Sequence, residues 1–158
     1  MKKFAIVALT LASTTAFANE LTNYDLPTPQ TLVQYNFGAY NVNNGVVTPL
    51  QNNTISRGNP NHRLCWTVIA PVPMFTQTVS AKETITSPVG GSFTDGQSIV
   101  QSSIDGTHHV VSSMITPIGG TILERCWQFN TSDPLGKYTL SSEFNGEVMP
   151  MREFTVVE

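Results

Sequence analysis

The sequence predicts an all-β fold, an antiparallel β-sandwich of seven to nine short strands. Three observations favour this class. Charged residues make up 12% of the chain, about half the usual share, and no long Leu/Ala/Glu/Lys segment indicates a helix. Apolar runs alternate with turn signals about every ten residues, as in sandwiches. Two cysteines in a chain that begins like an exported protein indicate one disulfide.

The first residues predict a secretory signal peptide, residues 1–18. Lys2 and Lys3 form a positive start, Phe4–Leu11 is an apolar run, and Ala16–Ala18 has the small-x-small pattern of a cleavage site. Ser13–Thr15 interrupts the apolar run, which is too short for a membrane helix. We expect cleavage after Ala18 and export to the periplasm or exterior of a bacterial cell.

The rest of the chain predicts one domain with a short leader. Residues 19–30 contain Pro27 and Pro29 and indicate an extended leader, and residues 31–158 the sandwich domain. Without Lys2 and Lys3 the balance is 6 basic against 11 acidic residues. The basic residues are scattered, so nothing indicates nucleic-acid binding. No later stretch is long and apolar enough to span a bilayer.

Nine apolar-rich runs are candidate strands. They are Leu32–Tyr40, Val46–Ile55, Arg63–Ala70, Thr76–Thr86, Ser98–Ile104, Thr107–Thr116, Thr121–Phe129, Lys137–Phe144 and Met151–Val157. Turn pairs at Asn44-Gly45, Gly119-Gly120 and Asn145-Gly146 match the twist of antiparallel hairpins, and Asp95-Gly96 and Asp105-Gly106 are further candidates. The least patterned stretch, Thr86–Gly106, is either a long connecting loop or a hairpin.

The two cysteines lie in matching contexts, Leu64-Cys65-Trp66 and Arg125-Cys126-Trp127. Strand alternation places both tryptophans on the core face and both cysteines on the opposite face. We therefore predict a cross-strand disulfide on the outer face of one sheet, with the indoles side by side beneath it. A redox pair is the alternative, but the spacing is not that of a Cys-x-x-Cys motif.

Tyr138 is a candidate structural residue. The spacing Asp133-x-x-Gly136-x-Tyr138 resembles the tyrosine corner of immunoglobulin-like sandwiches, in which the phenol bonds to upstream backbone. On this strand Tyr138, Leu140 and Phe144 would point inward.

Two stretches carry a family resemblance. Residues 35–40, Tyr-Asn-Phe-Gly-Ala-Tyr, and residues 127–156, through Gly136-Lys137-Tyr138-Thr139-Leu140, resemble a bacterial family of exported immunoglobulin-like domains with no established function. The resemblance implies an immunoglobulin-like sandwich and transfers no catalytic residue.

No motif indicates chemistry. His108 and His109 are neighbours and would face opposite sides of a strand, so we expect solvent-exposed side chains rather than a metal site. His62 is isolated. Asp105, near His108 and His109, leaves a weak loop site as the alternative. We expect no catalytic, cofactor-binding or metal-binding residue and no enzyme activity.

The functional hypothesis is a non-enzymatic binding or accessory domain of the bacterial envelope, a monomer with a protein or glycan partner. The alternatives are a structural subunit of the pilin or adhesin type and a small exported enzyme or metal carrier.

Overall fold

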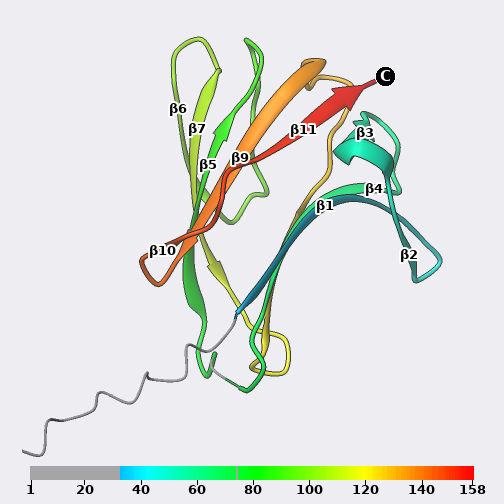
Figure 1. Cartoon of the computed structure of the whole chain (residues 1–158). Coiled ribbons are helices and arrows are strands. Elements are labelled where there is room, and N and C mark those ends of the chain that lie inside the picture. The colour runs from blue at the N-terminus through cyan, green and yellow to red at the C-terminus, as the bar shows by residue number, and fades with distance from the viewer. Residues whose placement is uncertain (1–32, 74) are drawn as a thin grey trace, which may run out of the picture. The chain divides into compact units, whose positions relative to one another are not determined.

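The computed structural model describes residues 33–73 and 75–158 of the chain (Figure 1). The predicted signal peptide, residues 1–18, and the predicted leader, residues 19–30, lie outside the described residues. The described part contains eleven strands and one short 3₁₀ turn, η1 (Gln51–Asn53). No helix in this part is long and apolar enough to cross a membrane.

The strands are short and follow one another closely. In chain order they are β1 (Gln34–Asn43), β2 (Val46–Pro49), β3 (Thr54–Ser56), β4 (His62–Ile69), β5 (Val79–Thr86), β6 (Ile99–Ser102), β7 (His108–Ile115), β8 (Ile122–Trp127), β9 (Gly136–Phe144), β10 (Glu147–Val148) and β11 (Arg152–Val157).

Two sheets form the sandwich (Figure 1). The smaller sheet has the order β2-β1-β4-β8, and the larger has the order β3-β11-β9-β5-β7-β6, with β10 paired to β9. Neighbouring strands are antiparallel except β3 and β11, which run parallel. The fold is the predicted all-β, immunoglobulin-like sandwich.

The eleven strands exceed the predicted seven to nine because one predicted run is divided in two and because the short strand β10 lies outside the nine predicted runs. The run Val46–Ile55 contains β2, η1 and β3. The N–H of Leu50 still donates to Ala39 O of β1 at 2.8 Å, and just beyond it Asn52 and Asn53 adopt positive φ angles of 54° and 48°. The chain therefore leaves the smaller sheet after β2 and joins the larger one at β3.

Two-residue hairpin turns occur at two of the predicted pairs, and a third pair, Asp105-Gly106, lies in the longer turn between the paired strands β6 and β7. Asn44 and Gly45 connect β1 to β2, and Asn145 and Gly146 connect β9 to β10. All four residues have positive φ, between 49° and 81°. Type I′ turns require this conformation, which Asn and Gly tolerate best.

The core lies between the two sheets and follows strand alternation. Trp66 and Trp127 are buried in it, as are Leu64 and Val68 on β4 and Leu123 on β8. The larger sheet contributes Ala81, Ile85, Val111, Tyr138, Leu140, Phe144 and Phe154.

The predicted disulfide joins Cys65 and Cys126. These residues are direct partners in the antiparallel pairing of β4 and β8, with a Cα–Cα distance of 4.1 Å. Both belong to the strand face opposite Trp66 and Trp127, and Cys126 is exposed. The bridge is therefore a cross-strand link on the outer face of the smaller sheet.

Tyr138 lies at the start of β9 and is buried. Its hydroxyl donates a hydrogen bond to the Pro134 carbonyl oxygen at 2.6 Å. The ring stacks on Phe154 with centroids 5.0 Å apart. This geometry joins the turn before β9 to the core, as in a tyrosine corner.

Removal of the disulfide should destabilise the fold without changing its topology. The two cysteines are 61 residues apart, and closing such a loop restricts the unfolded chain. We expect the double substitution Cys65→Ala/Cys126→Ala to lower the free energy of unfolding by about 2 to 4 kcal/mol. Urea unfolding followed by tryptophan fluorescence measures this. The wild-type protein in reductant is the control and should approach the variant; an unchanged midpoint in both would contradict the prediction.

Candidate functional site

The centre of the sandwich contains a buried carboxylate. Glu83 is on β5, where alternate residues Val79, Ala81, Glu83 and Ile85 point inward. Its exposed fraction is 0%. A charge in such a place is tolerated only when surrounding groups replace the water it has lost.

Two tryptophans supply the first of these groups. The indole nitrogens Nε1 of Trp66 and Trp127 both donate to the same oxygen, Oε1 of Glu83, at 2.7 and 2.9 Å. Trp66 is on β4 and Trp127 on β8, so one carboxylate of the larger sheet joins two strands of the smaller sheet.

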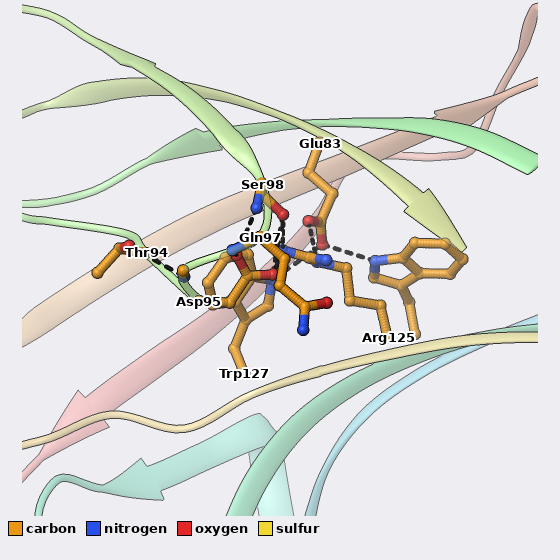
Figure 2. A network of polar contacts seen from close by, with 9 residues as sticks. Glu83, Thr94, Asp95, Gln97, Ser98, Arg125 and Trp127 are labelled. Atoms are coloured by element: carbon orange, nitrogen blue, oxygen red, sulfur yellow. Dashed lines mark hydrogen bonds and ion pairs between the residues drawn. The ribbon is translucent and has the colours of Figure 1, made fainter. Parts of the chain in front are cut away.

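Arg125 supplies the third group and the counter-charge. Its Nε lies 2.6 Å from Glu83 Oε2. Its guanidinium carbon lies 4.5 Å from the centroid of the Trp127 ring, a cation–π distance. Figure 2 shows Arg125 extending from its strand between Glu83 on one side and Asp95 on the other.

The surroundings of Glu83 determine its charge state. Burial raises the pKa of the Glu83 carboxyl, and Arg125 and the two indole N–H groups act in the opposite direction. Every polar partner of this carboxyl in the described residues is a donor. Because no neighbour accepts a carboxyl proton, the geometry fits the ionised form.

Asp95 extends the network toward the surface. Arg125 Nη2 donates to Asp95 Oδ2 and to Ser98 Oγ, both at 2.9 Å. Partial desolvation acts to raise the pKa of Asp95. Hydrogen bonds from the Gln97 and Ser98 backbone, the Ser98 hydroxyl and the charge of Arg125 outweigh it and hold that pKa well below its usual range. We call the group of Glu83, Trp66, Trp127, Arg125 and Asp95 the Glu83 network.

Residues 87–98, which we call the strap, connect β5 to β6 without regular structure. Phe93 is its buried anchor and makes edge contacts with Trp127, Phe129 and Tyr138 at centroid distances of 5.4 to 6.4 Å. With Asp95 bound to Arg125, the strap is attached to the core at two closely spaced residues. This segment belongs to the stretch Thr86–Gly106 that the sequence left undecided.

His109 is buried, with 1% of its surface exposed, and the prediction that it is solvent-exposed is wrong. Its Nδ1 lies 2.8 Å from Ser102 Oγ, and its Nε2 lies 3.0 Å from Ser87 Oγ and 3.1 Å from Gly106 O. Since a carbonyl only accepts, Nε2 carries the proton and Nδ1 accepts from Ser102. His108 points the other way and is exposed, as predicted.

The histidines lie in separate environments. His62 accepts a hydrogen bond at Nδ1 from Ser56 N, whereas His109 packs under the strap against Phe93. The described residues contain no group of three or more His, Cys, Asp or Glu side chains able to hold a metal.

The sequence analysis missed Glu83 and Arg125. The signal is present in the alternation: Glu83 has the parity of Val79 and Ile85, and Arg125 has the parity of Leu123 and Trp127. Two opposite charges at inward positions indicate a buried ion pair.

A hollow lies on the outer face of the smaller sheet, opposite the face from which Trp66 and Trp127 contact Glu83. The outer face of the smaller sheet carries a hollow of about 490 Å³ over the disulfide, which we call the disulfide hollow. All four strands of that sheet contribute outward side chains: Asn36, Tyr40, Val42, Val47, Arg63, Cys65, Thr67, Ile69, Glu124 and Cys126.

Gly38 makes room for one wall of this hollow. A Cβ atom at Gly38 would lie 3.0 Å from Tyr40 Oη and 3.1 Å from its Cζ. The Tyr40 ring therefore folds back over Gly38, whose direct partner on β4 is Cys65. This explains why an aromatic residue follows a glycine by two positions in the motif of residues 35–40.

The two features differ in what they can do. In the Glu83 network the charged groups bind one another, which makes it a structural centre. The disulfide hollow presents apolar and polar side chains to the outside on a cross-linked sheet, which is suited to binding.

Comparison with known families assigns the chain. The model of the PM0630 beta sandwich domain family matches residues 35–157. The chain belongs to this family. The matched region contains all of the Glu83 network and all of the disulfide hollow, so both are features of a PM0630 beta sandwich domain.

Two solved structures are similar in fold. An immunoglobulin-like protein from Pseudomonas aeruginosa shares 11% identity, with a TM-score of 0.49 over 82% of this chain and 99% of that chain. The Pseudomonas fluorescens alkylpurine DNA glycosylase AlkC, bound to DNA containing an abasic site analog, shares 13% identity, with a TM-score of 0.42 over 80% of this chain. This chain covers 30% of that glycosylase chain. None of the curated proteins matches the sequence.

Neutralising Glu83 should strongly destabilise the PM0630 domain. Glu83→Gln leaves Arg125 in the core without its buried counter-charge, and we expect a loss of about 3 kcal/mol in the free energy of unfolding. The matched control is Glu143→Gln on the neighbouring strand, which removes an ion pair with the half-exposed Lys82 and should cost at most about 1 kcal/mol. Urea unfolding measures both. Equal losses in the two variants would contradict the central role of Glu83.

His109 should make stability depend on pH. Desolvation lowers its pKa below the usual 6.5, so the unfolded chain binds more protons than the folded one as the pH falls through about 6.5. Stability should be full above that pH and decrease below it. Comparing the urea midpoint at about pH 7.5 and about pH 5.5, we expect a smaller decrease in His109→Gln than in the wild type. His108→Gln is the control, since that residue is exposed, and it should keep the wild-type decrease; a wild-type decrease in His109→Gln would refute the assignment.

Proposed function

We propose that this chain is a non-enzymatic exported domain of the bacterial envelope that binds a protein partner on the outer face of its smaller sheet. The observation that carries the proposal is the disulfide hollow. Its place on a sheet cross-linked by Cys65–Cys126 gives a surface that is ordered before a partner arrives. Such pre-organisation lowers the entropy lost on binding.

Export is supported by the start of the sequence and by the disulfide. Lys2, Lys3, Phe4–Leu11 and Ala16–Ala18 have the pattern of a signal peptide. Disulfides such as Cys65–Cys126 persist mainly in oxidising compartments. Both agree with the periplasm or the cell exterior.

A protein partner is favoured over a glycan by the lining of the hollow. Its apolar side chains are mostly aliphatic, Val42, Val47 and Ile69, and Tyr40 is its one aromatic residue. Aliphatic surface is best covered by apolar side chains of another protein. Val47, on the edge strand β2, is more than half exposed, so this part of the apolar lining is accessible.

The absence of a catalytic role is supported by the arrangement of the charges. Glu83 and Arg125 are bound to each other and to the two indoles. His109 has both ring nitrogens within hydrogen-bond distance of protein groups. A general acid or base has to reach a substrate, and these side chains contact the interior instead.

A charge on the hollow should abolish partner binding. We expect an envelope protein from the source cell to be retained by the immobilised wild-type domain and by Val148→Asp, but lost with Val47→Asp. Both valines are exposed on short strands, Val47 on the smaller sheet and Val148 on β10 of the larger, so they form a matched pair. Quantitative mass spectrometry of the eluted proteins measures the difference.

Two results would contradict the proposal. Retention of the same proteins by both valine variants would show that the disulfide hollow is not part of the interface. A carbohydrate, rather than a protein, as the component lost with Val47→Asp would replace the protein partner with a glycan.

A further inference from the structure

Among the described residues, β8 is the longest strand that ends either sheet. β8 ends the smaller sheet and has six residues. The other terminal strands, β2, β3 and β6, have four, three and four residues. A terminal strand carries backbone N–H and C=O groups that no neighbouring strand engages.

The disulfide shows which groups of β8 point outward. In antiparallel pairs, residues that exchange hydrogen bonds have Cα atoms about 5.5 Å apart, and the alternate pairs about 4.5 Å. Cys65 and Cys126 are 4.1 Å apart and thus form a pair of the second kind. The N–H and C=O of Cys126 therefore point away from β4, and alternation gives the same direction for Glu124 and Ile122.

Ile122 provides an independent check of this assignment. Its N–H donates to Ile118 O at 3.1 Å, and its carbonyl oxygen accepts from Ile118 N at 2.8 Å. Both groups of Ile122 thus point away from β4, as the disulfide register requires. Ile118 also closes the edge at this end of the strand.

The remaining free groups belong to Glu124 and Cys126. No hydrogen bond between described residues engages their backbone N–H or C=O groups. The strap passes nearby, but its contacts with β8 are made by side chains, Asp95 to Arg125 and Phe93 to Trp127. Among the described residues, the strap therefore makes no hydrogen bond to these backbone groups.

We propose that the protein partner adds an extended segment to the free edge of β8, bonded to the backbone of Glu124 and Cys126. This inference rests on the proposed function and names the form of the partner. Donors and acceptors that alternate at strand spacing are matched by the backbone of another strand. The disulfide and the Glu83 network hold β8 in place on its two faces, so the edge is already formed.

The position of the edge also specifies side chains of the added strand. Residues opposite Glu124 and Cys126 would point to the outer face, beside the disulfide hollow, because directly paired residues share a face. A basic residue opposite Glu124 and an apolar residue opposite Cys126 would complement them. The residue between these two would point toward a second hollow of about 340 Å³, lined in part by Arg125 and Met114.

Proline at position 124 tests the edge directly. Glu124→Pro removes an N–H that points away from β4, so the ladder within the sheet is kept; proline is tolerated at such edge positions. Glu124→Thr is the matched control, because it removes the same carboxylate and keeps the N–H. The probe is a phage-displayed library of random peptides of about nine residues, long enough to add a strand, selected on the mature wild-type domain.

We expect the selected peptides to bind Glu124→Pro at least about tenfold more weakly than Glu124→Thr, as measured by fluorescence anisotropy. Hydrogen exchange followed by NMR on the wild-type domain gives a second readout that does not depend on folding of the proline variant. The amides of residues 124 and 126 should exchange fast in the free domain and become protected with peptide bound.

Three results would overturn the inference: equal binding to the two position-124 variants, unprotected amides in the complex, or no selected peptide. Peptides that bind both variants but are lost with Val47→Asp would show that the hollow binds protein without strand addition. The proposed function would then stand and only the edge would be rejected.

Discussion

The sandwich depends on one buried carboxylate, Glu83, which joins its two sheets. Removing an ion from water costs several kcal/mol even after relaxation, and in this core the cost is offset by two indole N–H groups and a guanidinium. Because each donor has a fixed direction, the carboxylate accepts only one relative position of β5 against β4 and β8. An apolar core residue would add burial at this place but would make no directional bonds between the sheets.

The pair β4–β8 is consequently held on both faces. Trp66 and Trp127 attach it to Glu83 on the inner face, and the disulfide between Cys65 and Cys126 closes it on the outer face. Arg125 continues from the core to Asp95 and so attaches the strap to the same strand. β8, which is held in these three ways, also forms the free edge of the smaller sheet and one side of the disulfide hollow. A surface of this kind changes little on binding, which favours recognition by a preformed shape.

Strand alternation accounts for both the success and the failure of the sequence analysis. Alternation placed Cys65 and Cys126 on the outer face, and the predicted export of the chain favoured a disulfide between them. Neither inference requires knowledge of contacts between residues that are distant in the sequence. The sequence analysis did not apply alternation to His109, whose polar side chain suggested solvent although its parity with Val111 indicated the core. Glu83 and Arg125 were missed for a related reason: parity marks each of them as inward-pointing, but the two strands that bring them together lie far apart in the chain. The division of the run Val46–Ile55 depends on the left-handed backbone conformations of Asn52 and Asn53. Asparagine tolerates several backbone conformations, and tertiary contacts decide which of them is adopted.

In the proposed mode of binding, the edge and the hollow would be needed together for recognition. Glu124 and Cys126 offer four backbone groups, and four hydrogen bonds at about 0.5 to 1.5 kcal/mol each supply about 2 to 6 kcal/mol. Association itself costs about 4 kcal/mol or more in lost translational and rotational freedom. Backbone pairing alone would therefore give weak binding and no choice among sequences, since every polypeptide has the same backbone. Under the proposal, burial of a partner's apolar side chains in the disulfide hollow would supply the missing free energy, and the shape of the hollow would supply the selectivity. The short open edge, limited by Ile118 at one end and flanked by the charge of Glu124, also protects the free domain from pairing with other strands indiscriminately.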